Sequence, residues 1–195
     1  LATAQGGAIN VIRISGEKAI EIVSQIFTPK GGVPLEQRKS HTVIFGDLCT
    51  NGTEVLDEVL VTLMRAPHSY TGEESVEISC HASAYITQQI LLSLLDLGAR
   101  QAEPGEFTMR AFLNGKMDLT EAEAVADLIA AQTKAEKDLA LSQLRGGISN
   151  ELAQLREQLL TITSLIELEL DFADHEELEF ADRSQLNELA TVIDR

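Results

Sequence analysis

The chain has 195 residues, enough for one domain or two small ones, and its 44% hydrophobic and 24% charged residues exclude collagen-like, coiled-coil-only and disordered classes. No apolar run approaches the roughly 18 residues that cross a bilayer. The 15 basic and 31 acidic residues give a net charge of −16, which repels nucleic-acid phosphates and anionic membranes. We therefore expect a cytoplasmic protein that makes no membrane contact and does not bind RNA by itself.

Cysteine and histidine usage gives no sign of a metal or disulfide site. The two cysteines, Cys49 and Cys80, have no CxxC spacing, which argues against a disulfide framework or a zinc cage. The four histidines are scattered, and His81 points to the opposite strand face from Cys80. The acidic run at 167–182 lacks the glycine and alternating oxygen ligands of an EF-hand. We therefore predict no metal site in this chain.

The composition of the chain changes near residue 117. Residues 1–117 hold 13 acidic and 9 basic residues, all four prolines and 11 of the 13 glycines, whereas residues 118–195 hold 18 acidic and 6 basic residues. This pattern predicts a turn-rich α+β domain over 1–117 and a helical domain over 118–195. Because the chain begins with Leu1 rather than Met, we expect that its start has been trimmed or that it is a piece of a longer protein.

A strand followed by a helix is predicted at the start of the first domain. Residues 8–14 form a short β-branched run that is typical of a strand. Ser15 follows it and is a suitable cap for a helix that carries Ile20, Val23 and Phe27 on one face.

Three further strands are predicted. Residues 41–48 and 54–64 are rich in apolar side chains, and the Asn51-Gly52 pair between them provides the positive φ angles of a tight hairpin. Residues 75–80 alternate strictly, so that their apolar and polar side chains point to opposite faces of a sheet.

A second helix of the first domain is predicted over residues 83–97, where the apolar spacing is helical and Gly98 provides a left-handed terminator. The first domain is therefore predicted to be α+β, with a mixed sheet and helices on one face.

Long helices are predicted in the second domain. Thr120 and Glu123 have capping-box spacing, and the alanine- and leucine-rich run that follows stops only at Gly146. Leucines and isoleucines over 152–166 form the seam of a second long helix, and a third helix begins near Ser184. Because this is an incomplete bundle, we expect either missing helices or an oligomer.

Three segments are denser in specific residues than a structural role requires, and each holds a charge in an unusual place. Arg13 lies inside an apolar strand, Glu77 inside an alternating strand, and Lys116 at the domain junction. Taken singly, each is more simply a charge on a wet sheet face or a snorkelling side chain. The chain has no Walker-type phosphate loop, because the Gly115-Lys116 pair lacks the other residues of that motif.

These segments resemble a known family. The strings GGAINVIRISG, APHSYTGEESVEISCH and PGEFTMRAFLNGKMDLTEAEAVADLI are similar to the N-terminal region of MnmE (TrmE), a family of bacterial tRNA modification GTPases, and occur in the same order. LRGGISNELAQLREQLL and IELELDF resemble the start of the family's helical domain. The resemblance therefore extends over essentially the whole chain.

The resemblance implies a folate-binding domain that forms a homodimer, with a fold similar to the tetrahydrofolate-binding aminomethyltransferases, followed by the first half of a helical domain. The G domain of the family is not in this chain, so sites for GTP, magnesium and potassium are expected to be absent, together with GTP hydrolysis and any catalytic residue. Members of the family act with the FAD-containing protein MnmG on the wobble uridine of tRNA, to which they add an aminomethyl-type group. We expect tRNA to contact the full complex rather than this acidic chain.

Matched residue by residue, Arg13, Glu77 and Lys116 stand where the family contacts 5-formyltetrahydrofolate. A pterin presents a ring N–H beside an exocyclic amine, and one carboxylate such as Glu77 can accept both. The anionic glutamate tail requires a cation, which Arg13 and Lys116 can provide. Which cation meets which end of the folate stays open at this point.

The sequence departs from the family pattern at several positions. Gln5 stands where an arginine is common, and Ala82 and Ser83 replace glycines, so that their Cβ atoms would narrow a site that needs close backbone approach. Two alternative hypotheses follow. The chain is a structural dimerisation module without a working folate site, or it is a stand-alone folate-dependent aminomethyltransferase-like enzyme, which the resemblance of the helical half disfavours.

Overall fold

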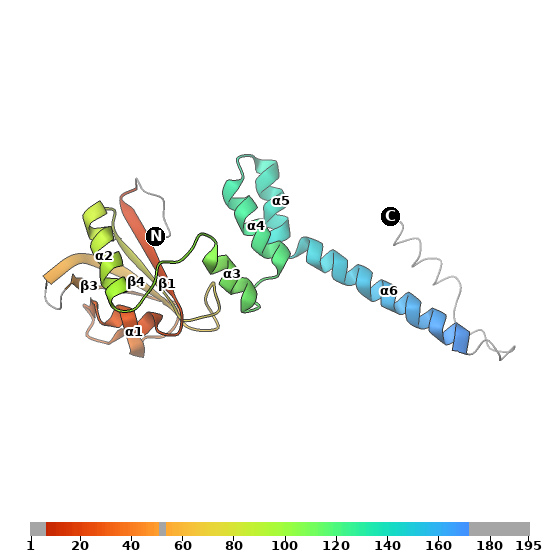
Figure 1. Ribbon diagram of the computed structural model, residues 1–195, viewed down its shortest axis with the longest axis horizontal. Coiled ribbons are helices and arrows are strands. Elements are labelled where there is room, and N and C mark those ends of the chain that lie inside the picture. Colours follow the sequence, from red (N-terminus) through yellow and green to blue (C-terminus); the bar gives the residue numbers. More distant parts are fainter. Residues whose placement is uncertain (1–6, 51–53, 172–195) are drawn as a thin grey trace. The chain divides into compact units, whose positions relative to one another are not determined.

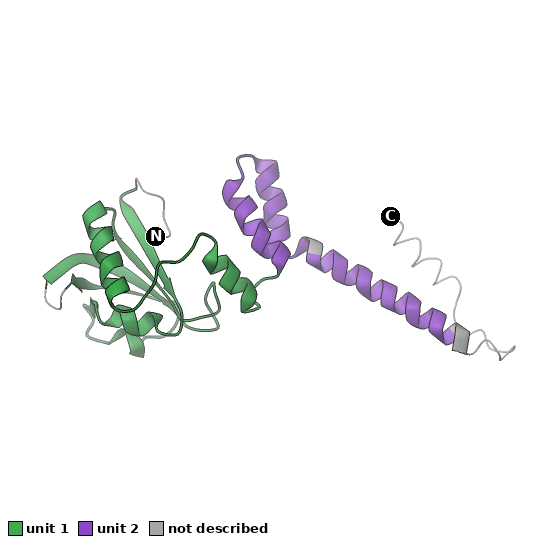
Figure 2. Cartoon of the chain, viewed as in Figure 1, with its two compact units in different colours: residues 1–118 green, residues 119–195 purple. Residues whose placement is uncertain are grey.

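The computed structural model describes residues 7–50 and 54–171 (Figure 1). The chain divides into two compact units, Leu1–Asp118 and Leu119–Arg195 (Figure 2). The first unit holds a sheet with helices, and the described residues of the second form helices.

A five-stranded sheet organises the first unit. Its spatial order is β1-β5-β4-β3-β2, and all four neighbouring pairs are antiparallel. The strands are β1 (Ile9–Ser15), β2 (Phe27–Pro29), β3 (Thr42–Thr50), β4 (Glu54–Met64) and β5 (Ser75–His81). The α+β class is confirmed, but the prediction of a mixed sheet is wrong. The helix after β1 leads to β2 at the opposite edge of the sheet, so no parallel neighbours form.

The predicted hairpin is present as the antiparallel pair of β3 and β4, which contains a bulge between Leu48 and Cys49. The Asn51-Gly52 turn proposed for it lies outside the described residues. The strict alternation of β5 is also confirmed, since Val76 and Ile78 are fully buried while Glu77 is partly exposed.

One face of the sheet forms the core of this unit. Cross-strand partners share a face, and Ile12, Ile78, Val61 and Ile44 form one buried row across four strands. Helices α1 (Ala19–Ser24) and α2 (Ala84–Asp96) contribute Val23, Ile90 and Leu94 to the same buried cluster. Full burial of each such side chain contributes roughly 1.5–3 kcal/mol to the free energy of unfolding.

The helix after β1 differs from its prediction. Ser15 is the last residue of β1, where it pairs with Ser75, rather than a helix cap. Helix α1 begins only at Ala19, and Phe27 belongs to β2. The serine hydroxyl is engaged by Thr71 at 2.6 Å, so it is not available to cap a helix.

The ends of α2 agree with the prediction. Ser83 caps this helix by accepting a hydrogen bond from the backbone N–H of Ile86, and Gly98 follows it with a φ of 96°. A short 3-10 helix, η1 (Leu35–Gln37), and helix α3 (Glu106–Leu113) complete the first unit.

The second unit contains α4 (Leu119–Ala130), α5 (Lys134–Leu144) and α6 (Gly147–Asp171). The single helix predicted from Thr120 to Gly146 is therefore wrong. The capping box lies at Thr133 and Glu136, each of which binds the backbone N–H of the other at 3.2 Å. Because this capping box lies in the middle of the alanine- and leucine-rich segment, a new helix begins there and the segment forms two helices rather than one.

Helix α6 covers the predicted leucine seam, yet most of that seam is exposed among the described residues. Leu152 is 60% exposed and Leu159 is 51% exposed. The helix predicted near Ser184 lies outside the described residues. Over the ranges that the structure describes, no helix is long and apolar enough to cross a membrane.

Candidate functional site

Arg13 and Glu77 form an ion pair on the sheet face opposite the core. They are direct cross-strand partners on β1 and β5. The Nε and Nη2 atoms of Arg13 lie 2.7 and 2.6 Å from the same carboxylate oxygen, Oε1 of Glu77. Both side chains are partly buried, with 32% and 25% of their surface exposed. The arginine therefore engages one carboxylate oxygen and leaves Oε2 to other donors.

Two aromatic rings flank the Arg13 guanidinium. The centroids of Tyr70 and Phe107 both lie 5.6 Å from its Cζ atom. Phe107 is supplied by α3, and its neighbour Thr108 is 2.9 Å from the hydroxyl of Tyr70. Each cation–π contact at a partly exposed position contributes about 0.5–1 kcal/mol. The rings thus hold the arginine head group in one orientation beside Glu77.

A cluster of hydroxyl groups anchors the loop that carries Tyr70. Ser15 Oγ lies 2.6 Å from Thr71 Oγ1 and donates to Glu73 Oε2 at 3.0 Å. Ser75 Oγ donates to Ser15 Oγ at 3.1 Å. Thr71 is fully buried and Ser75 is 2% exposed. These bonds fix the loop against the end of β1, close to the Arg13–Glu77 pair.

Lys116 contacts the same loop but not the ion pair. Its ammonium donates to the backbone oxygen of Pro67 at 3.1 Å, and within the described residues it makes no ion pair. A Cβ added to Gly72, whose φ is +80°, would come within 3.1 Å of the lysine Cγ. The absence of a side chain at Gly72 therefore lets the lysine lie against the loop. The structure brings Arg13 and Glu77 together, and Lys116 reaches the loop beside them.

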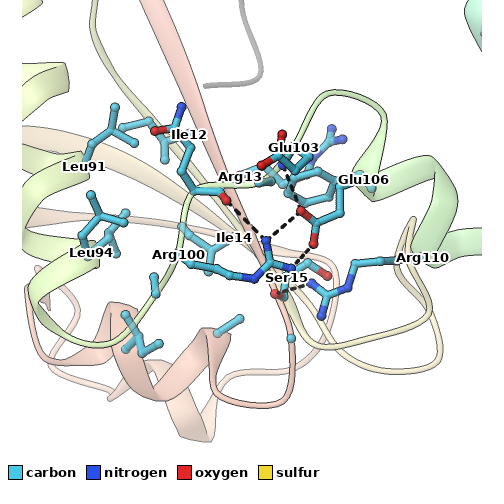
Figure 3. Close-up of a pocket in the computed structure, with 18 of the residues that line it drawn as sticks. Ile12, Arg13, Ile14, Ser15, Leu91, Leu94, Arg100, Glu103, Glu106 and Arg110 are labelled. Atoms are coloured by element: carbon cyan, nitrogen blue, oxygen red, sulfur yellow. Dashed lines mark hydrogen bonds and ion pairs between the residues drawn. The ribbon is translucent and has the colours of Figure 1, made fainter.

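A cavity of about 700 Å³ lies along the free edge of β1 (Figure 3). It is enclosed by β1, α1, α2, α3 and the segment 98–105. Arg13 lines this cavity, whereas Glu77 and Lys116 do not. Of the three predicted site residues, Arg13 therefore forms part of the cavity wall, and Glu77 and Lys116 lie outside the cavity.

Glu106 is a strongly held carboxylate in the cavity wall. It is only 6% exposed and accepts hydrogen bonds from Arg100 and from the backbone N–H of Glu103 (Figure 3). The hydrogen bond from Arg100, followed by that from the Glu103 backbone, lowers the pKa of Glu106 to about 2. This carboxylate is ionised at neutral pH and already paired.

The replaced glycines lie away from the ion pair. Ala82 directly follows β5 and donates its backbone N–H to the oxygen of Ala8, while Ser83 caps α2. Ala82 is five residues beyond Glu77, about 16 Å along an extended chain at roughly 3.3 Å per residue. The Cβ atoms at these two positions therefore do not narrow the space around the Arg13–Glu77 pair.

Sequence reasoning did not single out Tyr70, Thr71, Phe107 and Arg110. All four lie inside the two long strings that carry the family resemblance. The density of specific residues in these strings was the available signal. The sequence did not show that Tyr70 and Phe107 contact Arg13, or that Thr71 and Arg110 contact Ser15. Among residues 7–50 and 54–171, no group of three or more His, Cys, Asp or Glu side chains is arranged to hold a metal ion.

Comparison with known proteins identifies the family. The family model described as the N-terminus of the GTP-binding protein TrmE matches residues 1–116, and that of the MnmE helical domain matches residues 119–195. The chain belongs to the MnmE (TrmE) family. The resemblance found in the sequence is thereby confirmed, and the N-terminal family model includes Arg13, Glu77 and Lys116.

Curated relatives are similar to the whole of this chain. The tRNA modification GTPase MnmE of Bacteroides fragilis is 60% identical, and those of Parabacteroides distasonis and Phocaeicola vulgatus are 57% and 54% identical. Each comparison covers 100% of this chain but only 42–45% of the relative. The chain thus spans less than half the length of these MnmE proteins.

Proposed function

We propose that this chain is the folate-binding, dimer-forming N-terminal portion of a tRNA modification GTPase. Its ligand is 5-formyltetrahydrofolate or a related tetrahydrofolate, bound by Arg13, Glu77 and Lys116. The observation that carries the proposal is that Oε1 of Glu77 receives two nitrogens of Arg13, while no hydrogen bond to Oε2 is present among the described residues. We propose that Oε2 accepts a hydrogen bond from a pterin N–H.

The surroundings of the pair suit a flat, hydrogen-bonding ring. The remaining carboxylate oxygen of Glu77, Oε2, can accept a hydrogen bond from a pterin N–H group and so fix the position of the ring. The rings of Tyr70 and Phe107 each contact the Arg13 guanidinium and add aromatic surface near the carboxylate. The ammonium of Lys116 has three donors, and one of them is bound to the backbone oxygen of Pro67.

The dimer is supported by the sheet face that bears the ion pair. Phe45 and Leu60 are cross-strand partners on this face, and each is 47% exposed. Val43, in the adjacent row with Glu77, is 63% exposed. Apolar side chains gathered on one open sheet face favour association, and a second copy of this chain is the partner that we propose.

In the whole protein, we propose that this portion provides the folate as one-carbon donor for an aminomethyl-type modification of the tRNA wobble uridine. The FAD-containing MnmG is the proposed partner, and the cytoplasm the proposed location. GTP, with magnesium and potassium, would bind a G domain outside this chain, since the chain has no phosphate loop. Its net charge of −16 favours tRNA contacts elsewhere in the complex.

The alternative function is that of a dimerisation module without a working folate site. The specific observation in its favour is that Arg13 and Glu77 already bind each other, so neither requires a ligand to satisfy its charge. Calorimetry with 5-formyltetrahydrofolate separates the two functions.

For the folate hypothesis, the unchanged chain binds and Glu77→Gln weakens binding at least about tenfold, as expected for a lost hydrogen bond to a charged group. Glu54→Gln is the matched control, because Glu54 is an exposed carboxylate on β4 of the same sheet. Absence of binding by the unchanged chain, or equal affinity of the Glu77→Gln variant, contradicts the folate hypothesis.

A further inference from the structure

One part of the wall of the cavity beside β1, here called the floor, is apolar. None of the three residues of the proposed folate site belongs to it. Its volume of about 700 Å³ lies within the roughly 300–1,000 Å³ of small-molecule sites. Apolar side chains from β1, α1 and α2 line the floor, namely Ile14, Ala19, Ile22, Leu91, Leu94 and Leu95. Such a floor accommodates a hydrophobic or aromatic group.

Four basic side chains also line the cavity, and they differ in how fully they are paired. Arg13 is bound to Glu77 and Arg100 to Glu106. In contrast, the contacts of the Arg110 guanidinium with described residues are long, 3.3 Å to the oxygen of Ser15 and 3.5 Å to Glu73.

The other loosely held cation is Lys18, which is exposed and whose ammonium has no hydrogen bond or ion pair within the described residues. The carboxylates that line the cavity are Glu103, which is exposed, and Glu106, which Arg100 neutralises. Lys18 and Arg110 therefore have donors available for an anionic group at the rim.

We propose that this cavity binds the tail of the folate, with the p-aminobenzoyl ring on the apolar floor and the γ-linked glutamates at Lys18 and Arg110. The inference rests on the proposed function and extends it. Arg13 belongs both to the ion pair with Glu77 and to the cavity wall, so a ligand whose pterin lies at Glu77 continues past Arg13 into the cavity.

This arrangement indicates which basic side chains meet the pteridine end of the ligand and which meet its glutamate end. Lys116 does not line the cavity and contacts the loop at Pro67. It is therefore left for the pteridine and its formyl oxygen, while Lys18 and Arg110 determine how many glutamates the site favours. The chain thus selects polyglutamylated folates over the monoglutamate.

Calorimetry with two ligands tests this selection. The probes are 5-formyltetrahydrofolate with one glutamate and with four glutamates, titrated into the 195-residue chain. We expect the tetraglutamate to bind at least about fivefold more tightly, with a gain that decreases as salt is raised, because the added contacts are ion pairs at an exposed rim.

The double variant Lys18→Gln with Arg110→Gln is expected to lose this gain, so that it binds the two ligands with similar affinity. Lys39→Gln, which removes an exposed lysine that does not line the cavity, is the control and keeps the gain. Circular dichroism verifies that each variant is folded.

The outcomes separate the two levels of the hypothesis. Equal affinity for the two ligands in the unchanged chain overturns the tail site and leaves the folate function intact. If the double variant still binds the tetraglutamate more tightly than the monoglutamate, the tail site is also overturned, because the glutamate tail then binds elsewhere. If neither ligand binds the unchanged chain, the proposed function itself is wrong.

Discussion

The two units differ in how much of their apolar surface they bury by themselves. In the first unit, the sheet, α1 and α2 enclose a continuous cluster that includes Val61, Ile78 and Ile90, all fully buried. In the described part of the second unit, the buried apolar side chains are only those of Ala124 and Ala140. The first unit therefore stabilises its own fold and can fix a site, whereas the helices of the second unit depend on further contacts to cover their leucines.

The largest effect is expected from Ile78→Ala in the first unit. Ile78 is completely buried on β5, between β1 and β4, and removing its outer carbons costs about 2–5 kcal/mol in the free energy of unfolding. Leu159→Ala in α6, where the leucine is 51% exposed, is the matched variant and is expected to cost less than about 1 kcal/mol. Urea denaturation followed by circular dichroism measures the free energy of unfolding of both variants. Equal losses of stability in the two variants would contradict the claim that the first unit buries its apolar side chains and the second does not.

A second effect is expected at acidic pH in the first unit. The folded-state pKa of Glu106 is lowered to about 2, below its ordinary value, so its contribution to stability is fully present above the unfolded-state pKa. That contribution is lost as the pH falls through the range from about 4.5 to 2.

Thermal melts over this range test the pH prediction, and Glu106→Gln is expected to flatten the acid dependence. Glu54→Gln serves as the exposed control and is expected to leave the dependence unchanged. An equally steep acid dependence in the Glu106→Gln variant would show that Arg100 and Glu106 do not control it.

A smaller effect is expected in the second unit from Thr133→Ala. Loss of the capping hydrogen bond to Glu136 costs about 1 kcal/mol and loosens the start of α5. Hydrogen exchange of the amides in the first turn of α5 reports this loss. The control is Thr161→Ala in α6, whose hydroxyl bonds the preceding helical turn at Glu157. Similar exchange at α5 in both variants would contradict the role of the capping box.

Local patterns predicted elements whose signals lie within a few residues. The hairpin strands, the alternation around Glu77 and both ends of α2 were found because turn residues, periodicity and caps act over short distances. Ser15 was misassigned because a serine suits a strand end as well as a helix cap, and its partner Thr71 is 56 residues away. The break before Thr133 was missed because alanines on both sides continue the helical pattern.

The site was predictable in its residues but not in its arrangement. The charges at Arg13, Glu77 and Lys116 were visible in the sequence, together with the family resemblance that assigned them a ligand. The pairing of Arg13 with Glu77 depends on the register between β1 and β5, which joins residues 64 positions apart. The cavity was not predictable, because it forms only where α1, α2, α3 and the segment 98–105 meet the edge of the sheet.

The most direct test of the central claim is a crystal structure of this chain with 5-formyltetrahydrofolate. The folate-site hypothesis predicts a pterin N–H group within hydrogen-bond distance of the Glu77 carboxylate, with Arg13 still in contact with the rings of Tyr70 and Phe107. A ligand bound away from Glu77, or crystals that stay free of ligand at saturating concentration, would contradict it.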